Sequence, residues 1–217
     1  MKIAVLGTGM VGKAIGTKLV QLGHQVMKGS RTSNNEKATA WVQQLGANAS
    51  QGTFADAAKF GEIIFNCTNG AGALAALMAA GAENLDDKIL IDISNPLDFS
   101  RGMPPTLLVA NTDSLGEQIQ RTFPKSKVVK TLNTINCNVM VDPTLVPGEH
   151  DVFVSGNDAD AKAKVKDILI NWFGWKNVLD LGDITGARSM EMYVILWVRM
   201  MMGPAGNPNF NLHFVKS

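Results

Sequence analysis

The chain has 217 residues, of which 46% are hydrophobic and 18% charged, and its formal net charge is +1. This composition supports a sizeable core and excludes a disordered chain, and the near-neutral charge predicts no attraction to nucleic acid or to a membrane surface. Two cysteines are too few for a disulfide framework or a zinc site, and we expect both to be small buried apolar side chains. The opening residues leave no room for a signal peptide, so we expect a cytoplasmic protein.

The beginning of the chain has the pattern of a dinucleotide-binding unit. An apolar run over 2–6 leads into Gly7-Thr8-Gly9-Met10-Val11-Gly12, and a helix pattern over 10–22 and a second apolar run over 26–29 follow. In such a unit the first glycine allows the tight turn, the second lets the backbone approach the pyrophosphate, and the third lets the helix pack closely on the strand. The helix N-terminus offers unpaired N–H groups to the phosphates. The alternative is a glycine-rich turn without a ligand.

The end of the second strand indicates which dinucleotide binds. NAD-binding units place Asp or Glu about twenty residues past the glycines, where it bonds the ribose 2′-hydroxyl. This chain has Ser30, Arg31 and Thr32 there and no acid before Glu36. A guanidinium binds a 2′-phosphate in a forked, charge-assisted geometry that the two hydroxyls can supplement, and Lys37 adds a second positive charge. We therefore predict NADP(H); the alternative is that Arg31 is a solvated loop residue.

Strand and helix patterns alternate through the first part of the chain. Helices are predicted over 10–22, 35–45, 54–59, 71–80 and 114–122, and strands over 2–6, 26–29, 47–49, 63–67, 89–93 and 127–131. This alternation, with nearly continuous apolar strands, predicts a Rossmann-type, doubly wound α/β fold with a mainly parallel sheet. Cys67-Thr68-Asn69 and Asn95-Pro96 follow strand ends, where open α/β sheets form their ligand crevice, so we expect these residues to contact the cofactor.

The pattern changes after Cys137. Strands over 152–155 and 177–181 flank a helix over 159–172, and a long apolar helix is predicted over 185–202. These residues are too few for a large independent substrate domain. We expect an NADP-binding domain over 1–137 and a small C-terminal α/β lobe over 138–217, with a cleft between them. The last helix is apolar nearly all round and needs burial, either within one subunit or in a homodimer.

The residues that alcohol dehydrogenases use are not in their usual patterns. The only tyrosine, Tyr193, has Trp197 four residues on, where short-chain enzymes have lysine. We interpret the histidines as structural or solvated and keep His213 as a candidate, and we predict no metal site. Hydride transfer between a nicotinamide and a flavin-like ring needs stacking and exclusion of water rather than a protein acid or base. We therefore predict that no side chain is strictly catalytic.

Four segments together carry a family pattern. They are the glycine turn, Gly29-Ser30-Arg31, Ser94-Asn95-Pro96-Leu97 and Val128-Val129-Lys130-Thr131-Leu132-Asn133-Thr134-Ile135. The chain resembles, over its whole length, the coenzyme F420-dependent NADP oxidoreductase family, whose wider group includes the reductase domains of the STEAP metalloreductases. Archaeal members have His where this chain has Asn133, and an Asn-Gly-Met-Gly tail where it has Gly203-Pro204-Ala205-Gly206.

The resemblance implies hydride exchange between NADPH and F420 or a flavin such as FMN or FAD. It implies NADP contacts at Thr8, Gly9, Met10, Val11, Ser30, Arg31, Lys37, Thr68, Ile93 and Cys137. Asn95 and Asn133 would line the nicotinamide, and the acceptor-side candidates are Asn133, Thr134, Gly206 and His213. The expected partner is a small-molecule redox acceptor. Two alternatives remain, an NADPH reductase of a small carbonyl or imine and a non-catalytic NADP(H)-sensing protein.

Overall fold

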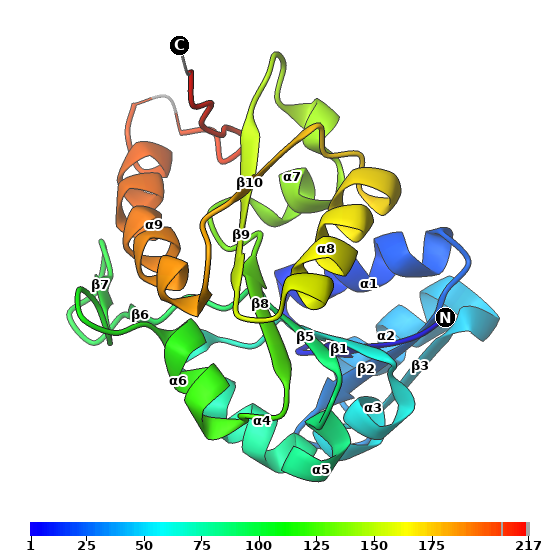
Figure 1. Ribbon diagram of the computed structural model, residues 1–217. Helices are drawn as coiled ribbons and strands as arrows, with labels where there is room; N and C mark the ends of the chain where they lie inside the picture. The colour runs from blue at the N-terminus through cyan, green and yellow to red at the C-terminus, as the bar shows by residue number, and fades with distance from the viewer. Residues whose placement is uncertain (205, 216–217) are drawn as a thin grey trace.

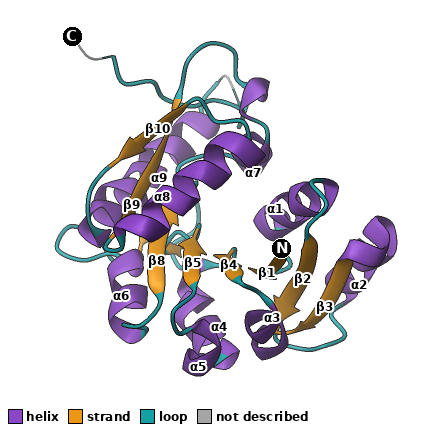
Figure 2. Ribbon diagram, turned by 45° about the vertical axis from the view of Figure 1, so that its right-hand side comes forward, coloured by secondary structure: helices purple, strands orange, loops and turns teal. Residues whose placement is uncertain are grey.

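The computed structural model describes residues 1–204 and 206–215, and its centre is one eight-stranded sheet (Figures 1 and 2). The strand order is β10-β9-β8-β5-β4-β1-β2-β3. The strands are β1 (Lys2–Leu6), β2 (Gln25–Ser30), β3 (Ala49–Thr53), β4 (Ile63–Asn66), β5 (Ile89–Asp92), β8 (Lys127–Thr131), β9 (Asp151–Gly156) and β10 (Asn177–Asp180). All neighbours are parallel except β8 and β9. From β3 to β8 this is the Rossmann order, so the predicted fold class is confirmed.

Helices cover both faces of the sheet, and each face has its own apolar core. The helices are α1 (Met10–Gln21), α2 (Glu36–Leu45), α3 (Phe54–Phe60), α4 (Ala73–Ala80), α5 (Ala82–Leu85), α6 (Leu115–Thr122), α7 (Cys137–Val141), α8 (Ala159–Asp167) and α9 (Ala187–Met201). Figure 2 shows α1 and α2 on one side of the strands and α3 and α4 on the other. Both faces of the parallel strands are therefore buried, as their continuous apolar character requires.

The helix starts follow from short polar side chains in the sequence. The side chain of Asn35 accepts the N–H of Ala38 at 3.2 Å and caps α2. Thr53 and Asp56 cap α3 reciprocally, each accepting the other's backbone N–H. Such caps satisfy the first N–H groups of a helix, which have no partner inside it.

One predicted strand is wrong and several short elements are additional. Residues 46–48 form a short 3₁₀ helix, and the strand that follows them, β3, begins at Ala49. This strand is polar and pairs only with β2 at the edge of the sheet, so no apolar run marks it. The helix predicted over 159–172 ends as α8 at Asp167 and continues as a π-helical turn to Trp172. A separate two-stranded sheet of β6 (Leu97–Asp98) and β7 (Thr106–Leu107) was not predicted.

The C-terminal part of the chain continues the same sheet. Because β9 is antiparallel to β8, its first residues lie beside the carboxyl end of β8, with Thr131 opposite Val154. The segment after α9 then packs back on β9, where Asp151 N–H donates to Leu212 O at 2.9 Å. The domain boundary expected after residue 137 lies within this continuous sheet, and the division into two domains stays a prediction. Among the described residues, no helix is both long and apolar enough to cross a bilayer.

Candidate functional site

The turn between β1 and α1 has the geometry of a phosphate-binding turn. Gly7 has a φ of +118°, and a Cβ there would lie 2.6 Å from the carbonyl oxygen of Cys67, so both conformation and space require glycine. A Cβ on Gly12 would lie 2.3 Å from Gly7 O, which shows how closely α1 packs on the turn. Gly9 is different, because a Cβ there would meet nothing within 4 Å. The space in front of Gly9 and the start of α1 is open to a ligand.

A buried polar network holds the ends of β4 and β5 beside this turn. Asp92 Oδ1 accepts from Asn66 Nδ2 at 2.8 Å and from Ser94 Oγ at 2.7 Å. Asn66 Oδ1 in turn accepts from Thr68 Oγ1 at 2.7 Å. These residues fix the loops in which the sequence predicts cofactor contacts. The loops also touch each other, since a Cβ on Gly70 would lie 1.9 Å from Asn95 O.

A buried ion triad lies beneath the same strand ends. Lys130 Nζ is 2.7 Å from Asp92 Oδ2 and 2.8 Å from Glu191 Oε1, and all three side chains are almost fully buried. Glu191, on α9, also accepts the N–H groups of Leu115 and Gly116 at the start of α6. Burial alone would lower the pKa of Lys130, but the charges of Asp92 and Glu191 raise it above its usual value. Lys130 therefore keeps its charge, and the triad fastens α9 to the sheet.

The segment after β8 is strained and lies against the loop after β5. Leu132 is in the left-handed region with φ of +61°, which is costly for leucine. Asn133 Nδ2 donates to Asn95 Oδ1 at 2.9 Å, and Asn95 Nδ2 donates to Asn133 O at 2.7 Å. Among the described residues, Asn133 Oδ1 and Thr134 Oγ1 are buried without a hydrogen-bond partner. Thr134 lines one ligand-sized hollow, and Asn95, the partner of Asn133, lines another.

The first hollow, the central crevice, lies at the carboxyl ends of β1, β4 and β5. Its lining includes eight of the cofactor residues predicted from the sequence. They are Gly9, Met10, Val11, Cys67, Thr68, Asn69, Ile93 and Asn95. Burial raises the pKa of the Cys67 thiol, which is consistent with its interpretation as a small apolar side chain. Pro96 is buried behind the crevice wall.

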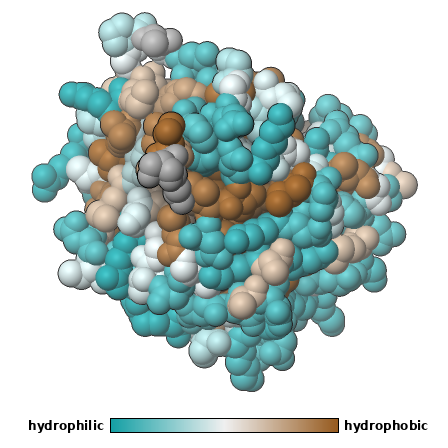
Figure 3. Space-filling model, turned by 45° about the horizontal axis from the view of Figure 1, so that its top comes forward, coloured by the Kyte–Doolittle hydropathy of each residue, from teal (hydrophilic) through white to brown (hydrophobic). Residues whose placement is uncertain are grey.

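The second hollow, the α9 cavity, lies between α9, the β9–β10 edge and the C-terminal segment. It has a volume of about 450 Å³, within the usual range for small-molecule sites. Its lining is mainly apolar, with Phe153, Met190 and Leu212 among the residues. Thr134 and Tyr193 also line it, and their hydroxyls are buried without a hydrogen-bond partner among the described residues. Figure 3 shows apolar side chains gathered in a hollow on the face that forms the top of Figure 1.

A third hollow, the lysine cavity, lies between α1 and α2. Thr8 and Lys37, two of the predicted NADP contacts, line it. Lys13 and Lys28 line it as well, and neither was among the predicted contacts. At the end of β2, Ser30 Oγ bonds Thr32 O, and the turn leaves Arg31 exposed. The end of β2 and this cavity therefore hold more positively charged side chains than the sequence pattern indicated.

Comparison with known proteins identifies the family. Residues 2–96 match the family model described as NADP oxidoreductase, coenzyme F420-dependent. The F420-dependent NADP reductase of Methanocaldococcus jannaschii is 30% identical over 200 residues, which are 88% of each chain. The chain belongs to the F420-dependent NADP oxidoreductase family.

Two further proteins are similar to this oxidoreductase. A crystal structure of a candidate F420-dependent NADP reductase from Arthrobacter sp. FB24 is 52% identical, with a TM-score of 0.93 over 100% of both chains. The metalloreductase STEAP3 of Rattus norvegicus is 30% identical over 194 residues, which are 88% of this chain but only 36% of that longer protein. The family and its named members support an NADP-dependent oxidoreductase that uses NADP(H).

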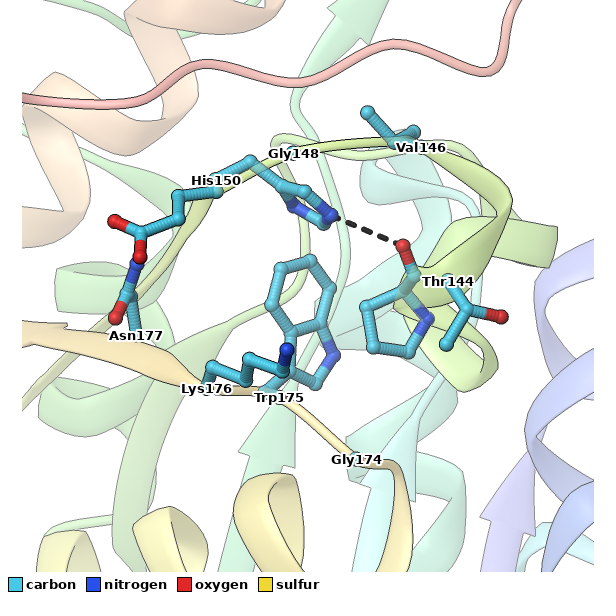
Figure 4. A pocket seen from close by; sticks show the side chains of 10 residues that line it. Thr144, Val146, Gly148, His150, Gly174, Trp175, Lys176 and Asn177 are labelled. Carbon is cyan, nitrogen blue, oxygen red and sulfur yellow. Dashed lines mark hydrogen bonds between the residues drawn. The ribbon is translucent and has the colours of Figure 1, made fainter.

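The histidines of the oxidoreductase lie away from the central crevice. His213 Nδ1 is 3.2 Å from Asp151 Oδ1 at the start of β9, and the ring is exposed. His150 is buried at the end of a loop: its ring stands edge-on to Trp175 and bonds Pro143 O at 3.0 Å (Figure 4). These contacts agree with its interpretation as a structural histidine.

The remaining predicted positions lie at the edges of the site. Cys137, expected to be buried, is only half-buried at the first position of α7, and it faces α1 across a groove shared with Met10. Gly206 has a φ of +48° and donates to Gly203 O; its neighbour Ala205 lies outside the described residues. Within residues 1–204 and 206–215, no group of three or more His, Cys, Asp or Glu side chains could hold a metal ion.

Proposed function

We propose that this oxidoreductase transfers a hydride between NADPH and a deazaflavin (F420) or flavin acceptor. The observation that carries the proposal is that one segment, Asn133-Thr134, connects the linings of two hollows. Asn133 bonds the wall of the central crevice through Asn95, and the next residue, Thr134, lines the α9 cavity. A dinucleotide held at the glycine turn would bring its nicotinamide to this segment, and a planar apolar ring in the α9 cavity would approach it from the other side.

The residues present fit the nucleotide. Gly9 and the start of α1 offer open space and backbone N–H groups to the pyrophosphate, since no side chain caps this helix. Arg31 lies one residue beyond β2, where the ribose 2′-phosphate is bound in this fold. Asn133 Oδ1 is buried without a partner among the described residues, and we expect the nicotinamide carboxamide to donate to it. The names of the relatives support F420 as an acceptor.

The protein's own contribution is then positioning and exclusion of water. NADPH supplies a hydride, which is two electrons and one proton, and the acceptor takes its second proton from solvent. The buried network around Asp92 holds the crevice wall, and the apolar lining of the α9 cavity would keep water from the acceptor ring. A homodimer stays a prediction: one face of α9 is buried within the subunit, while Met192, Leu196 and Met200 are exposed.

The direct test is NADPH oxidation by the purified protein with F420, FMN, FAD and riboflavin as parallel acceptors. We expect turnover with at least one of them. Turnover only with a small carbonyl or imine would overturn the acceptor class. Tight NADPH binding without turnover on any acceptor would favour an NADP(H)-sensing protein instead.

Replacing Arg31 with alanine tests the nucleotide end of the site. We expect the NADPH dissociation constant to rise by roughly tenfold to a hundredfold, because a charge-assisted pair contributes about 1.5–3 kcal/mol. The NADH dissociation constant should change little, since NADH lacks the 2′-phosphate. Titration calorimetry with both nucleotides measures the difference, and equal weakening of the two would mean that Arg31 has only a structural role.

A further inference from the structure

The strongest unexplained feature of the molecule is a buried lysine without an anion. Lys28 is only 1% exposed, and its Nζ lies 4.3 Å from the ring centroid of Trp41. Among the described residues it makes neither an ion pair nor a hydrogen bond that would hold its charge. An aromatic face only partly compensates a buried ammonium, whose removal from water is costly. This arrangement indicates that a negatively charged ligand completes the site.

Two more lysines surround the same space. Lys13 from α1 and Lys37 from α2 line the lysine cavity together with Lys28 from β2. No carboxylate lines it; its other polar groups are Thr8 and Gln44. Three ammonium groups around one hollow repel each other unless an anion lies between them. Because Lys13 and Lys37 are exposed while Lys28 is buried, the cavity has an open mouth and a charged floor.

The place of the cavity identifies the anion. Thr8 and Gly9 line it, so it opens directly beside the turn that faces the pyrophosphate. Lys28 is in the same strand as Ser30, two residues before its end. A dinucleotide bound at the turn carries one phosphate monoester near this strand end, the 2′-phosphate of NADP.

We propose that Lys28, with Lys13 and Lys37, forms a phosphate-monoester site that takes the 2′-phosphate and makes Lys28 a specificity-determining residue for NADP(H) over NAD(H). The inference rests on the proposed use of NADPH as hydride donor. It adds a buried charge to that of the exposed Arg31, and an ion pair in a low-dielectric site is screened less than one at the surface.

The site also makes the affinity for the nucleotide depend on the protonation of Lys28. Burial, and secondly the charge of Lys13, lower the pKa of Lys28 to about 8, while Cys67 opposes this shift. The groups that face Lys28 are Lys13 on α1, Lys37 on α2 and Cys67 after β4. A bound phosphate dianion favours the charged lysine and raises this pKa. NADPH therefore binds most tightly below pH 8, and its affinity falls as the pH rises and Lys28 loses its proton.

The experiment compares Lys28→Met with Lys59→Met, a change of an exposed lysine on α3 at the other face of the sheet. Affinities for NADPH, NADH, 2′,5′-ADP and 5′-AMP are measured by calorimetry on both sides of pH 8. We expect Lys28→Met to weaken NADPH and 2′,5′-ADP at least about tenfold at neutral pH and to abolish their pH dependence. NADH and 5′-AMP should bind as before, and Lys59→Met should behave as the unmodified protein.

Other outcomes would overturn the proposal. Unchanged NADPH affinity in Lys28→Met, or equal weakening of NADPH and NADH, would remove Lys28 from the phosphate site. Inorganic phosphate is also tested on the unmodified protein. If it binds and NADPH does not displace it, the cavity is a site for free phosphate instead. If Lys28→Met does not fold, Lys13→Met serves: it should weaken NADPH selectively and raise the pH at which affinity falls. Because these are binding measurements, failure of acceptor turnover leaves them intact.

Discussion

Replacing Lys130 with methionine should lower the free energy of unfolding by about 3–5 kcal/mol, the cost of breaking a buried ion pair from one side. The change leaves Asp92 and Glu191 close together, buried, and without the cation that both contact. Methionine has a similar volume, so packing contributes little to the loss. Urea unfolding measures the effect.

The matched control is Lys125→Met. Lys125 pairs with Asp86 at 3.0 Å, but its side chain is 71% exposed, and exposed pairs contribute less than about 1 kcal/mol. If both variants lose stability to the same small extent, the triad does not fasten α9 to the sheet. A large loss for Lys130 alone supports the arrangement in which α9, α6 and β8 depend on one buried charge cluster.

Replacing Gly9 with alanine should weaken NADPH and NADH alike by about a hundredfold, equivalent to about 2.8 kcal/mol, while leaving the unfolding temperature unchanged. The reason is that the added methyl would meet nothing in the protein but would occupy the space in front of the turn where the pyrophosphate is expected. Calorimetry and thermal unfolding together separate the two effects. An alanine variant that binds both nucleotides normally would contradict the assignment of the turn.

Gly12→Ala is the contrasting variant. Its methyl would lie 2.3 Å from the backbone oxygen of Gly7, so helix and turn must separate. We expect a loss of stability of about 1–3 kcal/mol, typical of overpacking, in addition to weaker nucleotide binding. The two glycines thus have different roles: the absence of a side chain at Gly12 allows α1 to pack on the turn, and its absence at Gly9 leaves space for the ligand.

The sequence allowed the fold class and most of the central crevice to be predicted, because both depend on local patterns. Apolar runs marked the buried strands, and the loops after β4 and β5 follow directly from strand ends. The prediction of the edge strand β3 was wrong for the same reason: its residues are polar, so no apolar run marks it. Its position is set by its pairing with β2. An irregular feature such as the left-handed Leu132 has no sequence signature at all.

Contacts between distant segments could not be predicted. Lys130 and Glu191 are far apart in the sequence, and only the packing of α9 makes them partners. Tyr193 lacks the lysine partner of a short-chain-type enzyme, yet its side chain lines the α9 cavity. Lys28 did carry a signal, a charged residue inside an otherwise apolar strand that ends at the cofactor site. Such a residue is buried only when something compensates its charge, and that would have justified selecting it.

The reversal of chain direction between β8 and β9 makes the crevice mechanically stiff. Hinge closure concentrates rotation in a few residues whose movement breaks few hydrogen bonds. Here an antiparallel ladder pairs Val129 with Gly156 and Thr131 with Val154. A swing of the α9 side relative to the glycine turn would have to break hydrogen bonds between β8 and β9. The central crevice and the α9 cavity therefore form part of one rigid body. The distance between them is set by folding and not by ligand binding.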